Sequence, residues 1–399
     1  MALIGRNLFI GSDEKIFIGT DGYDKTTEPT FVGVVTPSDG AADDNFGATV
    51  AIGYGKIVVG SRADDVSSNT DQGSVYIYDL DGNNEVKITA SDGAAGDWFG
   101  QHVAVGSGRI VVATTRDNSE QGAVYIFDLD GNQLSKITAS DGAVDDFFGR
   151  SVAVGSGKIV VGADGDDDNG SFSGSAYIYD LDGTNEIKIT ASDGAANDRF
   201  GGYVDIGSGR ILVAASNKNS NRGAVYIYDL HGNEVGIITA SDGSTGEYFG
   251  RLSIGFNKII IGAWRHWANF NDQGAIYIYD LDGNNEVKIT ASDAAANDQF
   301  GYWTAVGNGR IVVGAAHKHV NGNSDQGAIY IYDLDGNEVG IITASDGVAD
   351  DLFGYPVAVG DGRIVAGSIY RDLNSNSNVG GIYIYSTPES DHILDILDK

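Results

Sequence analysis

The sequence predicts an all-β protein, a seven-bladed β-propeller of four-stranded blades whose ring is closed by an N-terminal strand that completes the last blade. Two recurring features predict this fold. A Phe-Gly pair occurs seven times, at Phe46, Phe99, Phe148, Phe200, Phe249, Phe300 and Phe353. A Tyr-Ile-Tyr type of run follows each pair, at Tyr76, Tyr125, Tyr177, Tyr226, Tyr277, Tyr330 and Tyr383. Successive copies lie about 50 residues apart, a period typical of propellers and solenoids.

The two ends of the repeat array complement one another. Residues 31–40, FVGVVTPSDG, match residues 234–243, EVGIITASDG, which form the last quarter of an internal unit. The seventh unit stops after residues 381–386 and lacks this quarter. We therefore expect the N-terminal strand to finish the final blade, which protects sheet edges that would otherwise pair with other chains.

Each unit contains four strand patterns, which in the first unit are residues 48–53, 56–61, 73–80 and 85–91. The second and third patterns are apolar on both faces, as expected for sheets that stack face to face. Asp81-Gly82 predicts a hairpin turn between the third and fourth strands. The repeated Phe is expected to fill the space between blades, and the Gly after it to allow close approach of two backbones.

Two segments lie outside the predicted propeller, which spans residues 31–387. Residues 1–30 form an N-terminal extension in which residues 8–10 and 16–18 predict a short hairpin, either an anchor or a flap on the ring. Residues 388–399 form a tail whose apolar residues share one side of a short helix, with Ser390 or Asp391 as its cap. The tail is expected to dock on the ring or on another subunit.

The composition excludes several functions. The chain has 56 acidic and 25 basic residues, a net charge of −31. This charge argues against nucleic-acid binding, which depends on Lys and Arg at phosphates, and against anionic membranes. No apolar run is long enough for membrane insertion. The absence of Cys excludes disulfides and thiolate sites, and the N-terminus lacks the apolar run of a signal peptide.

The repeat resembles the FG-GAP repeat of integrin-α-type propellers. The resemblance covers residues 31–386 and rests on the Phe-Gly pair, the two strands after it, and the Gly-x-Val-Tyr-x-Tyr strand. The phrases ITASDGAA, VAVGSGRIVVG and YDLDG are also similar to repeat proteins encoded by marine bacteriophages. These resemblances imply a propeller that binds partners on the outside of a cell or particle.

The chain departs from the calcium-binding members of the family. Their acidic loop between the first two strands supplies the six or more oxygens that Ca²⁺ needs. Here the loop is short and ends in a cation, at Lys56, Arg109, Lys158, Arg210, Lys258, Arg310 and Arg363. We expect these cations either to neutralise Asp residues of the YDLDG turns or to be solvated. The acidic clusters at 39–44 and 79–83 leave Ca²⁺ binding open, but no cofactor is required and no residue is assigned to a metal.

The candidate ligand-binding residues lie in the loops between the second and third strands. Most of these loops are Asp, Asn, Ser and Gly, but two neighbouring units carry aromatic and basic residues: Trp264, Arg265, His266 and Trp267, then His317, Lys318 and His319. Such side chains suit a sugar face or a partner's carboxylates. The alternatives are loop drift, with Trp264 packed on the neighbouring blade, and a metal at the two histidines, for which two ligands are too few.

The favoured function is non-enzymatic, because carboxylate pairs fall at repeated positions and no catalytic cluster interrupts the repeat. The resemblance implies a structural and binding protein of a phage virion, such as a tail fibre, appendage or capsid decoration, assembled in the cytoplasm and released by lysis. Its partners would be other virion proteins or a host-surface glycan or protein, and homo-oligomer formation stays open. The alternatives are a bacterial adhesin-like propeller at the cell surface and a glycan-active enzyme that depends on His266 or His317.

Overall fold

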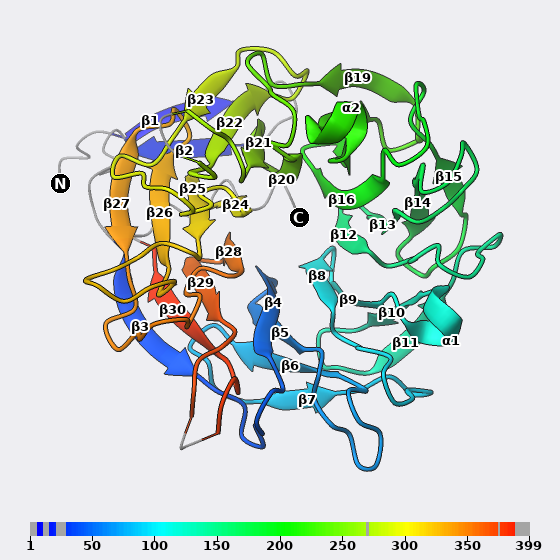
Figure 1. Cartoon of the computed structure of the whole chain (residues 1–399), viewed down its shortest axis with the longest axis horizontal. Helices are drawn as coiled ribbons and strands as arrows, with labels where there is room; N and C mark the ends of the chain where they lie inside the picture. The colour runs from blue at the N-terminus through cyan, green and yellow to red at the C-terminus, as the bar shows by residue number, and fades with distance from the viewer. Residues whose placement is uncertain (1–5, 11–15, 21–28, 269–270, 374–375, 388–399) are drawn as a thin grey trace.

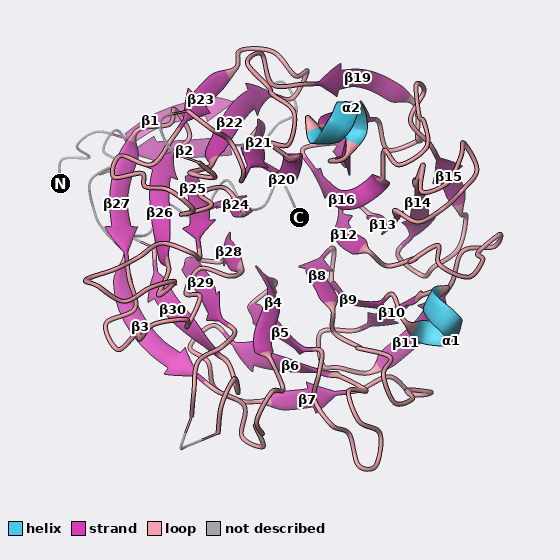
Figure 2. Cartoon of the chain, in the orientation of Figure 1, coloured by secondary structure: helices cyan, strands magenta, loops and turns pink. Residues whose placement is uncertain are grey.

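The computed structural model describes residues 6–10, 16–20, 29–268, 271–373 and 376–387. Within these residues, seven four-stranded antiparallel sheets are arranged around a central axis as the blades of a propeller (Figure 1). Almost all regular structure is strand (Figure 2). The predicted fold class, an all-β propeller with seven four-stranded blades, is confirmed.

Each blade is a meander in which consecutive strands pair. Blade one contains β4 (Phe46–Gly53), β5 (Lys56–Ser61), β6 (Ser74–Asp79) and β7 (Val86–Ile88). Blade two contains β8 (His102–Gly106), β9 (Arg109–Thr114), β10 (Ala123–Phe127) and β11 (Gln133–Ile137). Blade three contains β12 (Ser151–Gly155), β13 (Lys158–Ala163), β14 (Ser175–Asp180) and β15 (Ile187–Ile189).

The next three blades repeat the pattern. Blade four contains β16 (Phe200–Gly207), β17 (Arg210–Ala215), β18 (Ala224–Tyr228) and β19 (Glu234–Ile238). Blade five contains β20 (Phe249–Gly255), β21 (Lys258–Ala263), β22 (Ala275–Asp280) and β23 (Val287–Ile289). Blade six contains β24 (Trp303–Gly307), β25 (Arg310–Ala315), β26 (Ala328–Asp333) and β27 (Glu338–Ile342). Two single-turn helices, α1 (Asp117–Glu120) and α2 (Lys218–Asn221), lie in loops of blades two and four.

Blade seven combines the two ends of the ring. It contains β28 (Val357–Gly360), β29 (Arg363–Ser368) and β30 (Gly381–Ser386), with β3 (Thr30–Val35) as its outer strand. Strand β3 pairs antiparallel with β30, for example Thr30 with Ser386 and Val34 with Tyr383. The predicted closure of the ring by the N-terminal strand is therefore confirmed.

The space between neighbouring blades is filled by the residues that define the repeat. Phe46 is fully buried and contacts Tyr76 edge to face at a ring-centroid distance of 5.3 Å. The same cluster includes Ala358 and Ile382 of blade seven, so it joins the last blade to the first. Each such aromatic pair contributes about 0.5–1.5 kcal/mol beyond its buried area. Repetition of this packing between all neighbouring blades stabilises the ring.

The backbones of neighbouring blades touch at glycine. A Cβ atom added to Gly162 on β13 would lie 1.9 Å from the carbonyl oxygen of Gly201, in the Phe-Gly pair of blade four. The same close approach joins Gly60 to Gly100 and Gly262 to Gly301. A side chain at Gly60, Gly162 or Gly262 would therefore clash with the next blade. The next-to-last residue of the second strand is Gly in five blades and Ala, as Ala113 and Ala214, in the other two.

The first strand of every blade is the innermost one, so β4, β8, β12, β16, β20, β24 and β28 surround the central axis, whose line we call the channel (Figure 1). These strands begin at or just after the Phe-Gly pairs, which places the residues around each pair at one end of the channel. The Gly-rich turns that join the first and second strands lie at the opposite end.

The segments outside the ring are described only in part. Strands β1 (Arg6–Ile10) and β2 (Ile16–Thr20) pair antiparallel at the two runs expected to form a hairpin. The helix expected within residues 388–399 lies outside the described residues. In the part of the chain that is described, no helix has the length and apolar character needed to cross a membrane.

Candidate functional site

One ionic contact recurs in every blade. A cation lies against the Asp of the Ser-Asp motif and over the ring of the first Tyr of the third strand. The cation is Lys87, Lys136, Lys188, Lys218, Lys288, Lys318 or Arg371, and its nearest distance to that Asp ranges from 2.5 to 3.1 Å. In each blade the Tyr hydroxyl donates a hydrogen bond to the same Asp, as Tyr76 does to Asp39 at 2.7 Å.

The cation comes from two different places in the chain. In blades one, two, three and five it is the Lys of the fourth strand. Blades four, six and seven carry Ile237, Ile341 and Val34 at this strand position. In those blades the cation instead comes from the loop after the second strand, at the position where blade three has Asp166. Each blade therefore keeps one cation at this point, whichever element supplies it.

This network accounts for two of the predicted ligand-binding residues, which are buried and not on the surface. Lys318 is 8% exposed and pairs with Asp293 and Asp298 at 3.1 and 3.2 Å. His266 is 4% exposed, and its ring lies between Glu247 and Lys288. Both side chains satisfy buried charges inside their blades, so the expectation that they form part of an exposed patch is corrected.

The same network occupies the one place where described carboxylates converge as metal ligands would. Asp141, Asp166 and Asp168 bring one oxygen each within 4.8 Å of one another. The ammonium of Lys188 lies 2.7, 2.7 and 2.6 Å from these three carboxylates. The lysine ammonium therefore supplies the positive charge that a bound metal ion would otherwise provide.

The cations after the Gly turns behave partly as expected. Lys158 pairs with Asp180 at 2.5 Å, Lys258 with Asp280 at 2.8 Å, and Arg363 with Asp81 of the next blade at 2.7 Å. In contrast, the Arg109 and Arg210 guanidinium groups each donate to the carbonyl of the preceding glycine. Three of these cations therefore neutralise turn aspartates as expected, whereas Arg109 and Arg210 make a local backbone contact instead.

The remaining predicted residues do lie on the face that carries the loops. Trp264 stacks on Tyr248 at 5.5 Å and meets Tyr302 of blade six edge to face at 5.2 Å. Arg265 and Trp267 both bind Asp272, and Trp267 is 62% exposed. Trp264 therefore contacts the neighbouring blade and also forms part of a surface patch.

The two histidines of blade six lie beside a common carboxylate. His317 Nδ1 and His319 Nε2 are 3.5 and 3.6 Å from Asp325 Oδ1. Their rings do not join any group of three metal-ligating side chains among the described residues. They contribute polar, exposed surface to the rim of the same face.

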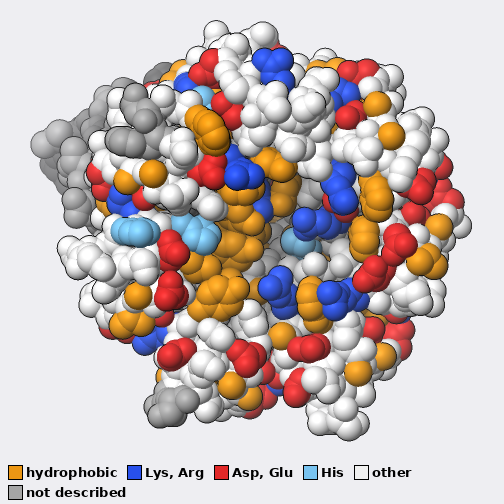
Figure 3. Space-filling model, in the orientation of Figure 1, with side chains coloured by type: hydrophobic (Ala, Val, Ile, Leu, Met, Phe, Trp, Pro, Cys, Tyr) orange, Lys and Arg blue, Asp and Glu red, His pale blue; other side chains and the backbone are white. Residues whose placement is uncertain are grey.

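A larger cluster forms where the seven copies differ around the Phe-Gly pair. The residues just before and after the pair, and the first residues of the following loop, are arginine or aromatic in several blades. We call this set the channel mouth: Arg62, Trp98, Arg116, Arg150, Arg199, Tyr203, Tyr248, Arg251, Trp264, Arg265, Tyr302, Trp303 and Tyr355. Figure 3 shows basic and hydrophobic side chains gathered around the centre of this face, although the chain as a whole is strongly acidic.

On one side of the mouth, arginines cover an aromatic ring. The guanidinium of Arg116 lies 3.2 Å from the ring centre of Trp98, and that of Arg62 lies 5.2 Å from it. Stacking on an aromatic face leaves the edge of a guanidinium free to donate hydrogen bonds. Both groups can therefore meet an anion that approaches along the axis of the ring.

At the opposite side of the mouth, Arg251 lies between aromatic rings. Its guanidinium carbon is 4.1 Å from the ring centre of Tyr203, 4.0 Å from that of Tyr302 and 5.1 Å from that of Trp303. The residue is only 9% exposed. Within the described part of the chain its guanidinium has no ion pair or hydrogen bond, and its Nε is buried without a partner.

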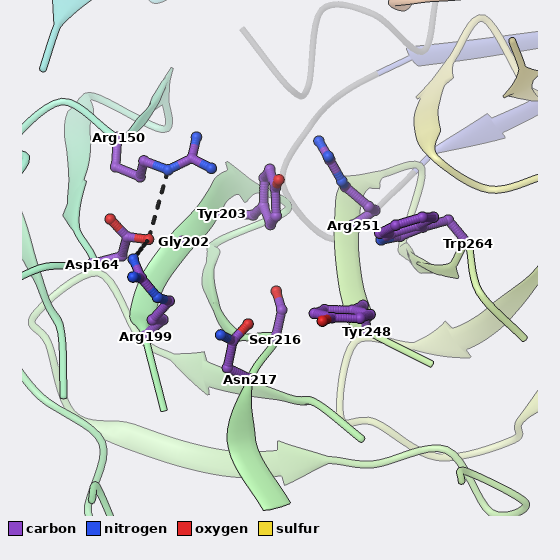
Figure 4. A pocket seen from close by; sticks show the side chains of 10 residues that line it. All are labelled: Arg150, Asp164, Arg199, Gly202, Tyr203, Ser216, Asn217, Tyr248, Arg251 and Trp264. Atoms are coloured by element: carbon purple, nitrogen blue, oxygen red, sulfur yellow. Dashed lines mark hydrogen bonds and ion pairs between the residues drawn. The ribbon is translucent and has the colours of Figure 1, made fainter. Parts of the chain in front are cut away.

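A cavity of about 290 Å³ opens between blades three, four and five beside Arg251. Figure 4 shows the side chains that line it: Arg150, Asp164, Arg199, Gly202, Tyr203, Ser216, Asn217, Tyr248, Arg251 and Trp264. Its one carboxylate, Asp164, lies 3.6 Å from Arg150 Nε and 3.2 Å from Arg199 Nη1. The hydroxyl of Ser216 is buried without a partner. The lining therefore combines three cations, one acid and three aromatic side chains.

The electrostatics of the mouth act on His102. Burial, followed by the charges of Arg150, Arg251 and Arg62, holds the pKa of His102 well below its usual value. The imidazole is thus neutral at physiological pH, and its Nε2 lies 3.4 Å from Arg150 Nη1, which donates. That three arginines from blades one, three and five affect one side chain shows how closely their charges converge.

The loop composition predicted only Trp264 and Arg265 of the channel mouth, because most of its other residues lie next to the Phe-Gly pairs and not in the variable loops. The signal was present in the columns that flank Phe-Gly. Residue Arg251, for instance, takes the strand position that Tyr203 holds in blade four and Trp303 in blade six, as the pairing with Gly262, Ala214 and Gly314 shows. At this position the residue changes between blades, for example among Ser, Tyr, Arg and Trp, although the adjacent Phe-Gly pair does not change. Such variation indicates that the packing of the repeat does not require a particular residue there.

Comparison with known proteins agrees with this architecture. The model of the FG-GAP repeat matches the chain seven times, over residues 30–78, 83–127, 132–179, 184–228, 233–279, 284–332 and 337–385. Each match runs from the outer strand of one blade through the third strand of the next, so the sequence unit and the blade are offset by one strand. No curated protein matches the chain closely enough to serve as a relative. Since the seven matches span nearly all of the ring, the chain belongs to the FG-GAP repeat family.

Proposed function

We propose that this FG-GAP propeller is a non-enzymatic binding protein, that its recognition surface is the channel mouth, and that its partner carries negative charge. One observation supports the proposal above others. Six arginines that break the repeat, Arg62, Arg116, Arg150, Arg199, Arg251 and Arg265, gather at one end of the channel in a chain of net charge −31. Clustered cations on an acidic body concentrate anions at one place while the rest of the surface repels them.

The chemistry of the mouth supports binding over catalysis. Hydrolysis of a glycosidic bond commonly needs two carboxylates, one to donate a proton and one to act as base or nucleophile. The cavity at the mouth is lined by the single carboxylate of Asp164, which pairs with two guanidinium groups. His102 is kept neutral by its surroundings and by Arg150.

The proposed biological setting is a virus particle, with the propeller as a tail fibre, appendage or capsid decoration that attaches to a host-surface glycan or to another virion protein. The reason for proposing this setting is the resemblance to marine bacteriophage repeat proteins that the sequence phrases suggest. An adhesin-like propeller at a bacterial surface would use the same mouth in the same way. Density-gradient separation of a lysate from the native source, followed by mass spectrometry, distinguishes them: the chain bands with capsid protein in a fixed ratio in the first case only.

Binding to a polyanion tests the role of the mouth. The full chain is passed over surfaces coated with dextran sulfate and with neutral dextran. We expect binding to the first only, and at least a tenfold loss in a variant with Arg116→Ala and Arg265→Ala. The matched control, Lys56→Ala with Arg109→Ala, removes the same charge at the opposite end of the channel and should bind as the wild type does.

Two results would contradict the proposal. One is equal binding by the mouth variant and the control variant, since this would mean that no localised site exists. The other is release of new reducing ends from a bound acidic polysaccharide, which would assign the mouth to an enzyme.

A further inference from the structure

Arg251 is a buried cation with no counter-charge among the residues that the structure describes. Removing a charged group from water costs several kcal/mol even in real proteins, and proteins usually offset this with a paired acid or several hydrogen bonds. The two tyrosine rings that flank Arg251 return part of this cost through cation–π contact. The buried Nε with no partner shows that the compensation is incomplete within the described part of the chain. The Nε is closed off from solvent, so an anion in the cavity would meet the terminal Nη groups, which form no hydrogen bond or ion pair with the described residues.

The side chain of Arg251 forms part of the wall of the cavity. The residue begins the channel-lining part of β20, and the pairing register shifts between Phe249 and Arg251, where blade five is one residue shorter than blade four. Figure 4 shows Arg150 and Arg251 on either side of Tyr203, with Arg251 beside Trp264. Two guanidinium groups from different blades thus share one aromatic ring and one cavity.

A second unsatisfied group lines the same cavity. The Oγ of Ser216, in the loop after β17, is buried and has no partner in the described residues. The amide of Asn217 lies next to it on the cavity wall, and Tyr248 and Trp264 form a stacked pair from blade five. The cavity therefore offers a charged wall, a wall of hydroxyl and amide groups, and an aromatic wall.

We propose that this cavity binds an acidic sugar residue, whose carboxylate is held by Arg251, while Arg150 on the other side of Tyr203 adds positive charge. The planar fork of a guanidinium matches the two oxygens of a carboxylate. The pyranose ring lies against the pair of Tyr248 and Trp264, because aromatic faces offer a rigid apolar surface with polar edges. Ring hydroxyls bond to Ser216 and Asn217. The inference rests on the proposed function and names its ligand class.

The size and charge of the site favour a sugar over other anions. A volume of about 290 Å³ is at the small end of ligand pockets, which suits a single sugar residue of a longer chain. Nucleic acid is disfavoured by the acidic surface around the mouth. A sugar polymer with one carboxylate per residue can place further charges near Arg116 and Arg62, which lie across the mouth on Trp98.

Calorimetry with oligogalacturonate tests the proposal, with its methyl ester and a neutral galactose oligomer of equal length as comparisons. We expect the wild type to bind the free acid and to bind the ester and the neutral oligomer at least tenfold more weakly. Arg251→Met keeps an unbranched side chain between the rings and should lose at least tenfold in affinity. Arg251→Lys keeps the charge without the fork and should lie between. Lys56→Met, at the far end of the channel, should bind as the wild type does.

Stability gives an independent readout. Because Arg251 is buried with no ion pair to any described residue, Arg251→Met should melt at the same temperature as the wild type or higher. Oligogalacturonate should raise the melting temperature of the wild type and not that of Arg251→Met. If the Met variant were unfolded, the Lys variant would carry the comparison.

Three outcomes would overturn the inference. Equal affinity for the acid and its ester would remove the carboxylate from the interaction. Tighter binding of a glutamate-rich peptide than of oligogalacturonate would make the partner a protein. No binding of oligogalacturonate, while dextran sulfate still binds through the mouth, would refute the sugar subsite and leave the proposed function standing.

Discussion

The ammonium of Lys218 lies 2.9 Å from the carboxylate of Asp198, inside blade four. It also reaches Asp193 at 3.1 Å, and so does for blade four what the strand lysine Lys188 does for blade three. Ile237 occupies the strand position that Lys188 holds. The same positive charge is thus supplied by the loop after the second strand in blade four and by the fourth strand in blade three.

The exchange predicts a rescue by double substitution. Lys218→Asp alone places a third carboxylate beside Asp193 and Asp198 without a cation, and should lower the free energy of unfolding by about 3 kcal/mol, the scale of a broken buried ion pair. Adding Ile237→Lys rebuilds the arrangement of blade three and should restore most of this loss. Denaturant unfolding of the single and double variants measures the coupling. Additive effects of the two substitutions would show that the two positions do not exchange one charge.

Calcium should have no effect on the stability of the wild-type chain. The Asp141, Asp166 and Asp168 cluster already holds the ammonium of Lys188. Thermal unfolding in excess Ca²⁺ and in excess EDTA should therefore give the same midpoint. Lys188→Met leaves the three carboxylates together and should lower the midpoint in EDTA, with partial recovery in Ca²⁺, since a stabilising ion must bind the folded state. A wild-type midpoint that falls in EDTA would place a structural metal elsewhere in the chain.

Asp205 should make stability depend on pH. Burial raises the pKa of this carboxyl to about 7, against two hydrogen bonds from the backbone N–H groups of Ile206 and Ile254. The folded chain then keeps a proton that the unfolded chain releases from about pH 4 upward, so this residue's contribution to stability falls between about pH 4 and pH 7. Asp205→Asn lacks that loss. Its melting temperature should exceed that of the wild type at pH 8 and approach it near pH 4; a constant difference across this range would refute the shift.

Gly162 should tolerate no side chain. An added Cβ would meet the carbonyl oxygen of Gly201 at 1.9 Å, and a backbone atom cannot move aside as a flexible side chain can. Gly162→Ala should therefore lower the free energy of unfolding by about 3 kcal/mol, at the upper end of overpacking costs. Gly33→Ala is the matched control, because nothing lies within 4 Å of the new Cβ. Equal stability of the two variants would show that the blades can separate slightly without cost.

The parts of the fold that could be predicted are those that repeat. Phe46 and Gly47 recur with their strands because every blade must fill the same space and allow the same backbone contact. The pairing of β3 with β30 followed from two incomplete units that complement one another. Repetition thus revealed the structural residues, since each copy meets the same physical requirement.

The binding site could be predicted only in part. Trp264 stood out because its loop and the loop of the next unit differ from the other five, whereas Arg251 lies next to Phe-Gly within a strand pattern. Its meeting with Arg150 and Tyr302 depends on how seven blades close around the axis, which no single unit encodes. Lys318 was misassigned because its partner Asp298 lies on a different loop, and only the missing strand lysine at Ile341 signals the pairing.

The pairing of β3 with β30 has a consequence for synthesis of the chain. Strand β3 leaves the ribosome before any blade exists, and the strand that it must join is among the last segments to be translated. Blades one to six can assemble during translation, but the seventh can be completed only when residues 381–386 have emerged. A prematurely terminated chain would therefore carry an open ring with an unsatisfied strand at each break, which proteases and chaperones recognise. The ring can therefore close only after the last strand of the repeat array has been translated.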